Sequence, residues 1–494
     1  MNPKSLAIRV LFLLLSSISL ANSDASRICQ CHKICRSLEG DAQNRELCER
    51  RCFSLCRGSG GERERSPNAR DEDHHAYNPY YFDERSYERW AETQHGRFRV
   101  LQRFAERSEL LRGIAEYRVA VLEAAPRAFL VPSHWDADEV FYVMGGEGTI
   151  TLLSEKNKES YDIKEGDTMV VPSGMIVYLI NKHRNEKLRI AMLLRPISIP
   201  GRFEEFFGAG GRKPETFYTS FSDEVLEAAF NTPRDRLERL FGQQSKGEII
   251  RASEEQIEAL SKSSRGGGGG GGERPFEQSR KPFNVLNKRP SYANNHGQLY
   301  EVNANDYRQF QDPNVDVSIA NISQGSMMAP NYNSRAIKIA FVVQGSGYME
   351  MACPHISKQK GSRRRGGGES EEEREKEGEE EQEEGPRYQL VKSEVCRGSV
   401  FVIPPGHPVV AVASPNENLQ VLCFGIRAEN NEKFFLAGRN NILKKMEKEA
   451  KELAFDVAAR EVDEVFNAQQ ESAFFPGPNQ RGGGGGRGRG STSF

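Results

Sequence analysis

The stretch Lys164–Asn181, KEGDTMVVPSGMIVYLIN, decides the fold because a second stretch repeats its design. The second is Arg397–Pro415, RGSVFVIPPGHPVVAVASP. In each, a glycine is followed by five residues, then Pro-x-Gly, then an apolar and β-branched run. This order predicts a strand, a tight turn and a second strand whose side chains are mostly buried. We therefore expect a chain built around two copies of one β unit.

Length and charge exclude several classes of protein. At 494 residues the chain is too long for one ordinary core, so we expect two or more domains. A formal net charge of -2 argues against a nucleic-acid-binding protein.

Lys4, an apolar run and small residues near Ala21 predict a secretory signal peptide over residues 1–21. Because Arg9 interrupts this short run, a membrane anchor is disfavoured, and we expect no membrane partner.

Residues 22–66 form a cysteine-rich segment that contains six of the nine cysteines. These six are Cys29, Cys31, Cys35, Cys48, Cys52 and Cys56. Two Cys-x3-Cys spacings place cysteines on one face of each of two helices. A hairpin this small needs covalent support, and the secretory context favours disulfides over zinc. The pairing of these cysteines is not determined by their spacing.

Two β-rich blocks with helical ends make up most of the chain. Residues 77–264 and 283–475 each contain short apolar runs divided by turn residues, followed by amphipathic helical sequence. A glycine-rich linker, residues 265–282, separates them. An acidic low-complexity insertion at 357–387 and a Gly/Arg tail at 476–494 are predicted to be disordered.

The helical end of the first block carries recognisable start and stop signals. Ser222 and Asp223 supply a helix N-cap, and Gly242 supplies a stop. Ser253 with Gln256 three residues later has the spacing of a capping box and predicts a second short helix.

The duplicated blocks resemble the cupin family. The resemblance implies a mainly β fold of two tandem cupin (conical jelly-roll) β-barrels, each followed by an α-helical arm. The second cupin motif, Gly-x5-Pro-x-Gly-x2-His-x3-Asn, is matched in the first copy except that Val177 replaces the histidine. In the second copy Val409 replaces it.

The first cupin motif is also incomplete. His134 and Glu139 can be matched in the first copy, whereas Asn333 and Lys338 replace the corresponding histidine and glutamate in the second. Neither barrel therefore has the three histidines and one glutamate of a metal-dependent cupin enzyme. We expect His134 and Glu139 to be structural or surface groups, and we predict no catalytic residue.

Longer motifs resemble plant vicilins, the 7S seed globulins. The motifs are NPYYF, ASEEQIEALS, NKRPSYANNHGQLYEV, ANISQGSMMAPNYNSRAIKIAFVVQGSGYMEMACPH, IPPGHPVV, ENLQVLCFGI and LAGRNN…KELAFDVAAREVDEVF. The resemblance implies a non-catalytic nutrient reservoir, a homotrimer joined through the helical arms, and storage in protein bodies or vacuoles of the seed until proteolysis at germination. Vicilins are often food allergens, so the resemblance also implies an allergen. It further implies a cupin pocket that can hold a small ligand.

One group of side chains has the chemistry of a metal site. Cys353-Pro-His355 lies on a predicted strand, where i, i+2 spacing places both side chains on one face. His407 follows the Pro-Pro-Gly turn of the duplicated element. One thiol with two imidazoles suits copper or zinc. Some vicilins hold copper with such a set and a tyrosine, and this resemblance adds Tyr80. The alternative is a buried free thiol near two histidines.

Other residues have weaker signals. Cys396 and Cys423 show no partner pattern and are interpreted as core thiols. Asn321-Ile-Ser323 is an N-glycosylation sequon, which permits a glycan.

Two functions compete with storage. A cupin metalloenzyme would use the copper-type site of the second block. A defence precursor would release the cysteine-rich segment, which resembles the antimicrobial or protease-inhibitory hairpin peptides of some vicilins.

Overall fold

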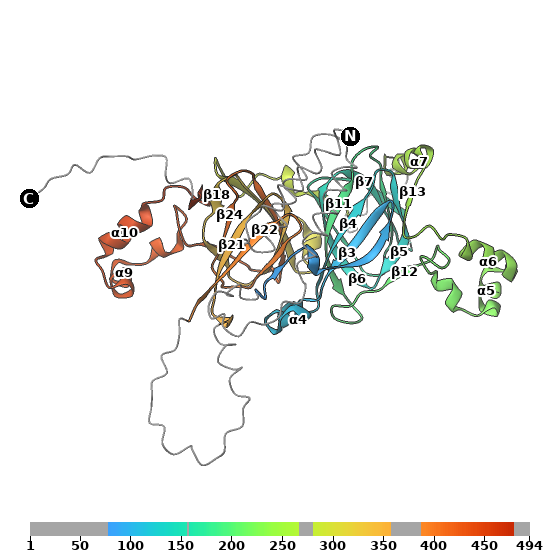
Figure 1. Cartoon of the computed structure of the whole chain (residues 1–494), viewed down its shortest axis with the longest axis horizontal. Coiled ribbons are helices and arrows are strands. Elements are labelled where there is room, and N and C mark those ends of the chain that lie inside the picture. The colour runs from blue at the N-terminus through green and yellow to red at the C-terminus, as the bar shows by residue number, and fades with distance from the viewer. Residues whose placement is uncertain (1–77, 156–157, 266–279, 357–386, 479–494) are drawn as a thin grey trace, which may run out of the picture.

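Two β barrels lie side by side in the computed structural model, with a pair of helices projecting from the outer end of each (Figure 1). The described residues are 78–155, 158–265, 280–356 and 387–478. The predicted signal peptide, cysteine-rich segment, nearly all of the linker and acidic insertion, and most of the tail lie outside them. Within the described ranges, no helix is long and apolar enough to cross a membrane.

The first barrel consists of two antiparallel sheets. One has the strand order β14-β9-β6-β11-β4-β3-β2, and the other has the order β12-β5-β10-β7-β8 with β13 beside β5. Their bounds are β2 Tyr87–Thr93, β3 Gly96–Leu101, β4 Arg118–Ala124, β5 Ala128–Trp135, β6 Ala137–Gly145, β7 Glu147–Leu153, β8 Lys158–Lys164, β9 Asp167–Val171, β10 Ile176–Asn181, β11 Leu188–Pro196, β12 Glu205–Phe207, β13 Ile249–Arg251 and β14 Phe283–Asn284.

The second barrel repeats this arrangement. One sheet has the order β1-β23-β20-β25-β17-β16-β15, and the other has the order β22-β21-β24-β18-β27, with β19 beside β24 and β26. Their bounds are β1 Tyr81–Phe82, β15 Tyr292–Asn294, β16 Gly297–Val302, β17 Val315–Ile322, β18 Ser326–Met328, β19 Asn331–Asn333, β20 Ile337–Gln344, β21 Ser346–Cys353, β22 Gln389–Cys396, β23 Val400–Ile403, β24 Val409–Ala413, β25 Leu419–Ile426, β26 Lys433–Phe435 and β27 Phe474–Pro476. The predicted pair of barrels is confirmed.

The duplicated sequence element forms the same corner in both barrels. Strand β9 pairs with β6 in one sheet, whereas β10 pairs with β5 and β7 in the other. The turn between them contains Gly174 at φ 75°, a left-handed conformation that suits glycine. Gly406 at φ 74° makes the equivalent turn between β23 and β24. The predicted strand, turn and strand are therefore confirmed, and the turn carries the chain from one sheet to the other.

The barrels exchange short strands. Strand β1, from the start of the first block, pairs with β23 of the second barrel through Tyr81 and Phe82. Strand β14, from the start of the second block, pairs with β9 of the first barrel. Strands β9 and β23 belong to the two copies of the duplicated element, so the exchange is reciprocal.

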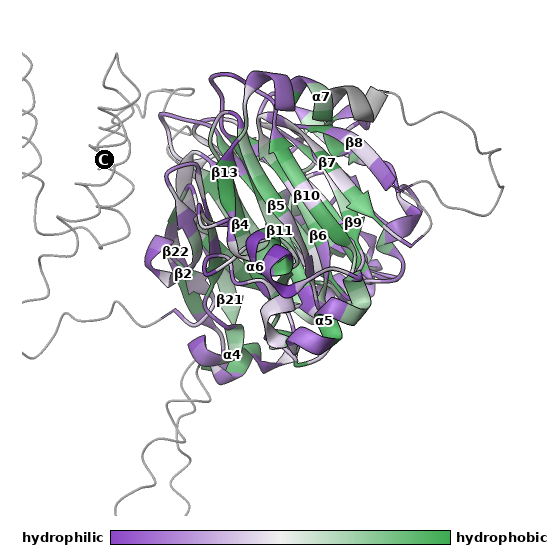
Figure 2. Cartoon of the chain, turned by 90° about the vertical axis from the view of Figure 1, so that its right-hand side faces the viewer, coloured by the Kyte–Doolittle hydropathy of each residue, from purple (hydrophilic) through white to green (hydrophobic). Residues whose placement is uncertain are grey.

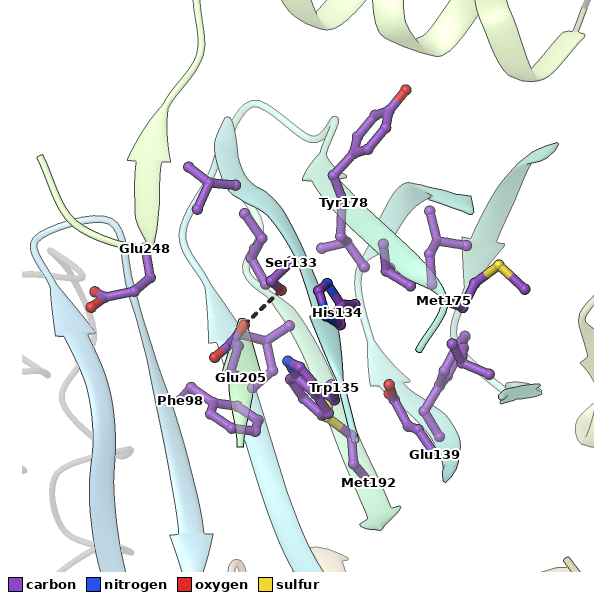
Figure 3. A pocket seen from close by; sticks show the side chains of 18 of the residues that line it. Phe98, Ser133, His134, Trp135, Glu139, Met175, Tyr178, Met192, Glu205 and Glu248 are labelled. Atoms are coloured by element: carbon purple, nitrogen blue, oxygen red, sulfur yellow. Dashed lines mark hydrogen bonds between the residues drawn. The ribbon is translucent and has the colours of Figure 1, made fainter. Parts of the chain in front are cut away.

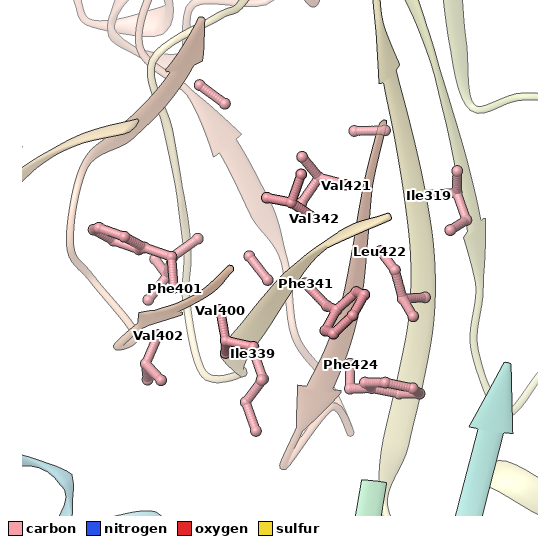
Figure 4. Packing of buried hydrophobic residues seen from close by; sticks show 14 of the residues in the cluster. Ile319, Ile339, Phe341, Val342, Val400, Phe401, Val402, Val421, Leu422 and Phe424 are labelled. Atoms are coloured by element: carbon pink, nitrogen blue, oxygen red, sulfur yellow. The ribbon is translucent and has the colours of Figure 1, made fainter. Parts of the chain in front are cut away.

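Many strands are buried on both faces, which explains their nearly continuous apolar sequences. In β11, Ile190 and Met192 pack inside the first barrel, whereas Ala191 and Leu193 belong to a second cluster. That second cluster runs without a break into the interior of the second barrel, part of which is drawn in Figure 4. The two barrels therefore share one hydrophobic core between them.

The helices lie mainly in two arms. Helices α5 Asp223–Phe230 and α6 Arg234–Gly242 follow the first barrel, and α9 Lys448–Phe455 and α10 Ala459–Asn467 follow the second. Both arms turn at a left-handed residue, Asn231 at φ 44° and Asp456 at φ 53°. The other α-helices of the described residues are α4 Phe104–Arg107 and α7 Glu254–Arg265, and short 3₁₀ helices span Glu84–Ser86, Glu109–Ile114, Phe217–Ser220, Val285–Asn287, Arg308–Phe310 and Ile442–Lys445.

Start and stop signals were predicted with mixed success. The capping box of α7 is confirmed, because the Ser253 amide donates to Gln256 Oε1 and the Gln256 amide donates to Ser253 Oγ. Ser222 precedes α5 as predicted, but its side chain makes no capping hydrogen bond. Gly242 is the last residue of α6. In Figure 2, strands β5, β10 and β11 of the first barrel are mostly apolar, whereas α5 and α6 contain both apolar and polar residues.

Candidate metal centre and barrel cavities

The predicted metal ligands come from three separate parts of the chain and meet at one edge of the second barrel. Tyr80 immediately precedes β1 and is 1% exposed. Cys353 is the last residue of β21 and is fully buried. His407 follows the Pro-Pro-Gly turn after β23 and is 6% exposed, whereas His355 is exposed.

Short distances join the four side chains. The Tyr80 hydroxyl lies 3.5 Å from Cys353 Sγ, and His355 Nδ1 lies 3.1 Å from His407 Nε2. The ligand atoms of Cys353, His355 and His407 all lie within 4.8 Å of one another. Among the described residues, this is the only such cluster of three cysteine, histidine or acidic side chains.

The backbone fixes the orientation of His407. Its Nδ1 lies 3.0 Å from the Pro405 carbonyl oxygen, which can only accept a hydrogen bond. Nδ1 therefore carries a proton and donates it to this carbonyl, which leaves Nε2 to interact with His355 and Cys353. A second contact of this kind is the usual way in which proteins orient a histidine that binds a metal.

The electrostatics of the cluster favour a thiolate. Burial alone raises the pKa of Cys353, but hydrogen bonds from His407, from Tyr80 and from backbone groups outweigh burial and lower it. Burial lowers the pKa of His407, whereas its hydrogen bonds with Cys353 and Pro405 raise it overall. Because a thiolate is the form that binds metals, the side chains present fit a soft metal ion such as copper or zinc.

The prediction that Cys353 and His355 lie on one strand was wrong. Strand β21 ends at Cys353, so His355 lies beyond the strand and the i, i+2 rule does not apply. The two side chains meet because the chain turns after Cys353 and brings His355 against His407, with ring centres 5.0 Å apart. Pro354, which lacks an amide hydrogen, suits the end of a strand and gave a signal for this turn.

His134 and Glu139 line a cavity of about 80 Å³ inside the first barrel (Figure 3). Val177, at the position of the expected cupin histidine, lines the same cavity. His134 stacks on Phe206 with ring centres 5.1 Å apart. Burial and the nearby charge of Glu205 raise the pKa of Glu139 to about 8. The residues around this cavity therefore do not form the metal cluster of a cupin enzyme.

The second barrel has a smaller cavity, of about 50 Å³, in which Lys338 replaces the glutamate and Val409 the histidine. Lys338 is 5% exposed and pairs with Asp316. Asn333, at the position of the other motif histidine, hydrogen-bonds Asn431 at 3.1 Å. Valine thus replaces the histidine of the second motif in both barrels, whereas His134 and Glu139 of the first motif remain in the first barrel alone.

Comparisons with known proteins agree with this architecture. A cupin family model matches residues 92–232 and 283–463. Vicilin Jug r 6.0101 of Juglans regia is 46% identical over 454 residues, which is 91% of this chain and 88% of the relative. The crystal structure of vicilin from Corylus avellana has 45% identity and a TM-score of 0.70, and it covers 81% of this chain and 100% of that one.

The chain belongs to the vicilins, the 7S seed storage globulins of the cupin family. A second vicilin structure, from Solanum melongena, has 36% identity and a TM-score of 0.71, and covers 81% of this chain and 98% of that one. Its title reports different anionic ligands in structurally similar pockets.

Cys423 and Cys396 of this vicilin differ in their bonding. Cys423 is a free cysteine that lines the second cavity, as expected for a core thiol. The prediction of a core thiol was wrong for Cys396, which is disulfide-bonded. Cys396 is half-buried and is the last residue of β22.

Asn321 of this vicilin is the next-to-last residue of β17. Its backbone pairs with Gln298 on one side and Gln420 on the other, and its side chain is half-buried. Glycosylation at Asn321 stays a prediction, and a mass loss of the intact chain after glycosidase treatment would test it.

Proposed function

We propose that this vicilin is a nutrient reservoir without catalytic activity. The observation that carries the proposal is the replacement of the cupin metal ligands in both cavities, by Val177 in one and by Lys338 and Val409 in the other. A cupin enzyme needs an open metal coordinated by several histidines, and neither cavity offers one. Storage needs only a compact fold that resists digestion until germination, which the shared core of the two barrels supplies.

The reservoir role is tested by the abundance of the chain in the seed. We expect quantitative mass spectrometry to detect accumulation in protein storage vacuoles during seed maturation and a steep loss during germination. Fragments should appear first from the acidic sequence at 357–387, which is rich in trypsin-type sites. A constant, low abundance through both stages would contradict the proposal.

We further propose that the subunit forms a homotrimer through its arms. Large apolar side chains are exposed on both arms, including Leu240 at 68% in α6 and Leu453 at 88% in α9. The arms project at opposite ends of the molecule (Figure 1). A head-to-tail contact between the arm of one subunit and the next subunit covers both apolar faces, and such contacts close into a ring.

The third proposal is a copper ion bound by Cys353, His355 and His407, with the Tyr80 hydroxyl beside the sulfur. The support is the donor set: one thiol with a lowered pKa, two imidazoles and a phenol brought together from distant parts of the chain. Thiolate and imidazole ligands suit copper and also zinc. Such an ion would join the segment before β1 to the second barrel and add stability.

Metal analysis of the full-length protein after copper loading and gel filtration tests this site. We expect about one ion per subunit in the wild type, and at least about a tenfold lower content in Cys353→Ser and His407→Ala. Cys423→Ser is the matched control, because Cys423 is the other free cysteine of the described residues. Equal copper content in all four proteins would contradict the assignment, and a parallel zinc loading shows which ion is preferred.

A further inference from the structure

The cavities of the two barrels occupy corresponding positions but differ in the sign of their charged groups. Glu139 of β6 lies opposite Val171, and Lys338 of β20 lies opposite Ile403. Val171 and Ile403 are equivalent, because each stands five residues after the glycine that opens the duplicated element. The cavity of the second barrel holds lysines, each already paired with an acid, whereas that of the first barrel holds glutamates.

Three carboxyl groups line the cavity of the first barrel, and its lining residues include no lysine or arginine. Glu139 is 9% exposed, and no hydrogen bond or ion pair joins its carboxyl group to any described residue. Glu248 Oε2 is buried and also has no hydrogen-bond partner in the described part of the chain. The Glu205 carboxylate does have a hydrogen-bond partner, because Ser133 Oγ donates to Glu205 Oε1 at 2.7 Å. Figure 3 shows these side chains around the cavity.

The rest of the wall is apolar and partly aromatic. Phe98 and Trp135 lie with ring centres 5.4 Å apart, and Phe141, Met175 and Met192 also line the cavity. An apolar wall binds the body of a small organic molecule. Aromatic faces also attract cations. An unpaired carboxyl at such a wall costs free energy unless it stays protonated or meets a positive group.

We propose that the cavity of the first barrel binds a small organic ammonium ion with an apolar or aromatic body, and that Glu139 is its counter-ion. The ammonium group donates hydrogen bonds to the Glu139 carboxylate, while the body of the ligand lies against the apolar wall. No resident cation competes for Glu139, because none lines the cavity.

Anionic and neutral ligands fit this cavity less well. An anion would gain no ion pair, because the lining residues include no lysine or arginine, and it would meet the carboxyl groups of Glu205 and Glu248. The anionic ligands reported for the vicilin of Solanum melongena make this the competing outcome. A neutral ligand of the same shape gains the apolar contact but not the ion pair.

Binding has a defined proton balance. In the free cavity Glu139 holds its proton at neutral pH, because burial and the charge of Glu205 raise its pKa to about 8. When the ammonium ion enters, the Glu139 carboxylic acid releases this proton to solvent and becomes the carboxylate of the ion pair. The other titratable groups that face Glu139 across the cavity are His134, Tyr178, Glu205 and Glu248.

Calorimetry with three matched probes on the full-length protein at pH 7 tests the proposal. Benzylamine, benzyl alcohol and benzoate share one ring and differ in the charge of the polar group. We expect benzylamine to bind at least about tenfold more tightly than either of the others. Repeating the titration in buffers of different ionisation enthalpy should reveal the release of close to one proton per benzylamine bound.

Two variants connect the result to Glu139. Glu139→Gln should weaken benzylamine binding at least about tenfold and abolish proton release, while its affinity for benzyl alcohol stays unchanged and shows that the cavity is intact. Glu147→Gln, which removes an exposed carboxyl of β7, should behave as the wild type. Tighter binding of benzoate than of benzylamine, benzylamine binding that is unchanged in Glu139→Gln, or no binding of any probe would overturn the proposal.

Discussion

At the scale of single residues, Glu139 shows how its surroundings set the ionisation of a side chain. Its pKa is raised to about 8 by burial and by the nearby charge of Glu205. A carboxyl whose pKa is higher in the folded chain holds its proton over a range in which the unfolded chain has lost it. Between an ordinary value of about 4.5 and about 8, the stability contributed by this residue therefore falls as pH rises.

Removing this carboxyl should change how stability depends on pH. We expect Glu139→Gln to match the wild type near pH 4.5 and to exceed it near pH 8 by on the order of 3 kcal/mol. Urea unfolding at pH 4.5, 6 and 8 measures the difference, and Glu147→Gln on the exposed surface is the control. A difference between Glu139→Gln and the wild type that does not grow with pH would count against the protonated state of Glu139.

Some of these residue roles were predictable and others were not. Val177 and Val409 stand in for motif histidines within a recognisable local pattern, so the loss of the enzyme-type metal ligands could be seen in the sequence. The raised pKa of Glu139 depends on burial inside the barrel and on Glu205, which the fold brings near it from β12. No local pattern carries that information.

At the scale of elements, the exchanged strand β1 ties the first block to the second barrel. Phe82 is fully buried, and its ring meets that of Phe104 edge-on with centres 5.6 Å apart. Two-residue strands such as β1 and β14 lack the length to show periodicity, so the sequence gives no sign of their exchange. By contrast, the capping box of α7 is entirely local and was correctly predicted.

Truncating the buried ring of β1 tests the role of this strand. We expect Phe82→Ala to lower the free energy of unfolding by about 3 to 5 kcal/mol, because it removes a large side chain and leaves a cavity. Ile197→Ala, at a site that is 57% exposed, should change stability by less than about 0.5 kcal/mol. Equal unfolding midpoints for both variants in urea would show that β1 contributes little to the second barrel.

At the scale of the whole molecule, one hydrophobic cluster joins the two barrels, whereas the arms leave large apolar side chains exposed. One cluster runs from the interface between the barrels into the second barrel, so the two barrels are packed as one body. Helices α9 and α10 instead leave Leu453 and Val465 exposed at 88% and 68%. The repeated barrel and arm were predictable from the sequence, whereas the way in which the barrels share a core depends on packing.

Charging one arm should prevent assembly. We expect the double variant Leu453→Glu with Val465→Glu to sediment as a monomer in analytical ultracentrifugation under conditions in which the wild type is a trimer. Its far-ultraviolet circular dichroism should be unchanged, because both side chains lie outside the barrel cores. Lys445→Glu changes the net charge by the same amount at an exposed site and should stay trimeric. A trimer formed by the double variant would exclude this arm from the interface.

We propose that both barrels have lost the cupin metal centre and that any bound metal lies at the edge of the second barrel. Anomalous diffraction at the copper edge, on crystals of the copper-loaded full-length protein, tests it most directly. We predict a single peak between Cys353, His355 and His407 and none in either barrel cavity. A peak beside His134 and Glu139 would contradict the claim and restore the case for a cupin enzyme.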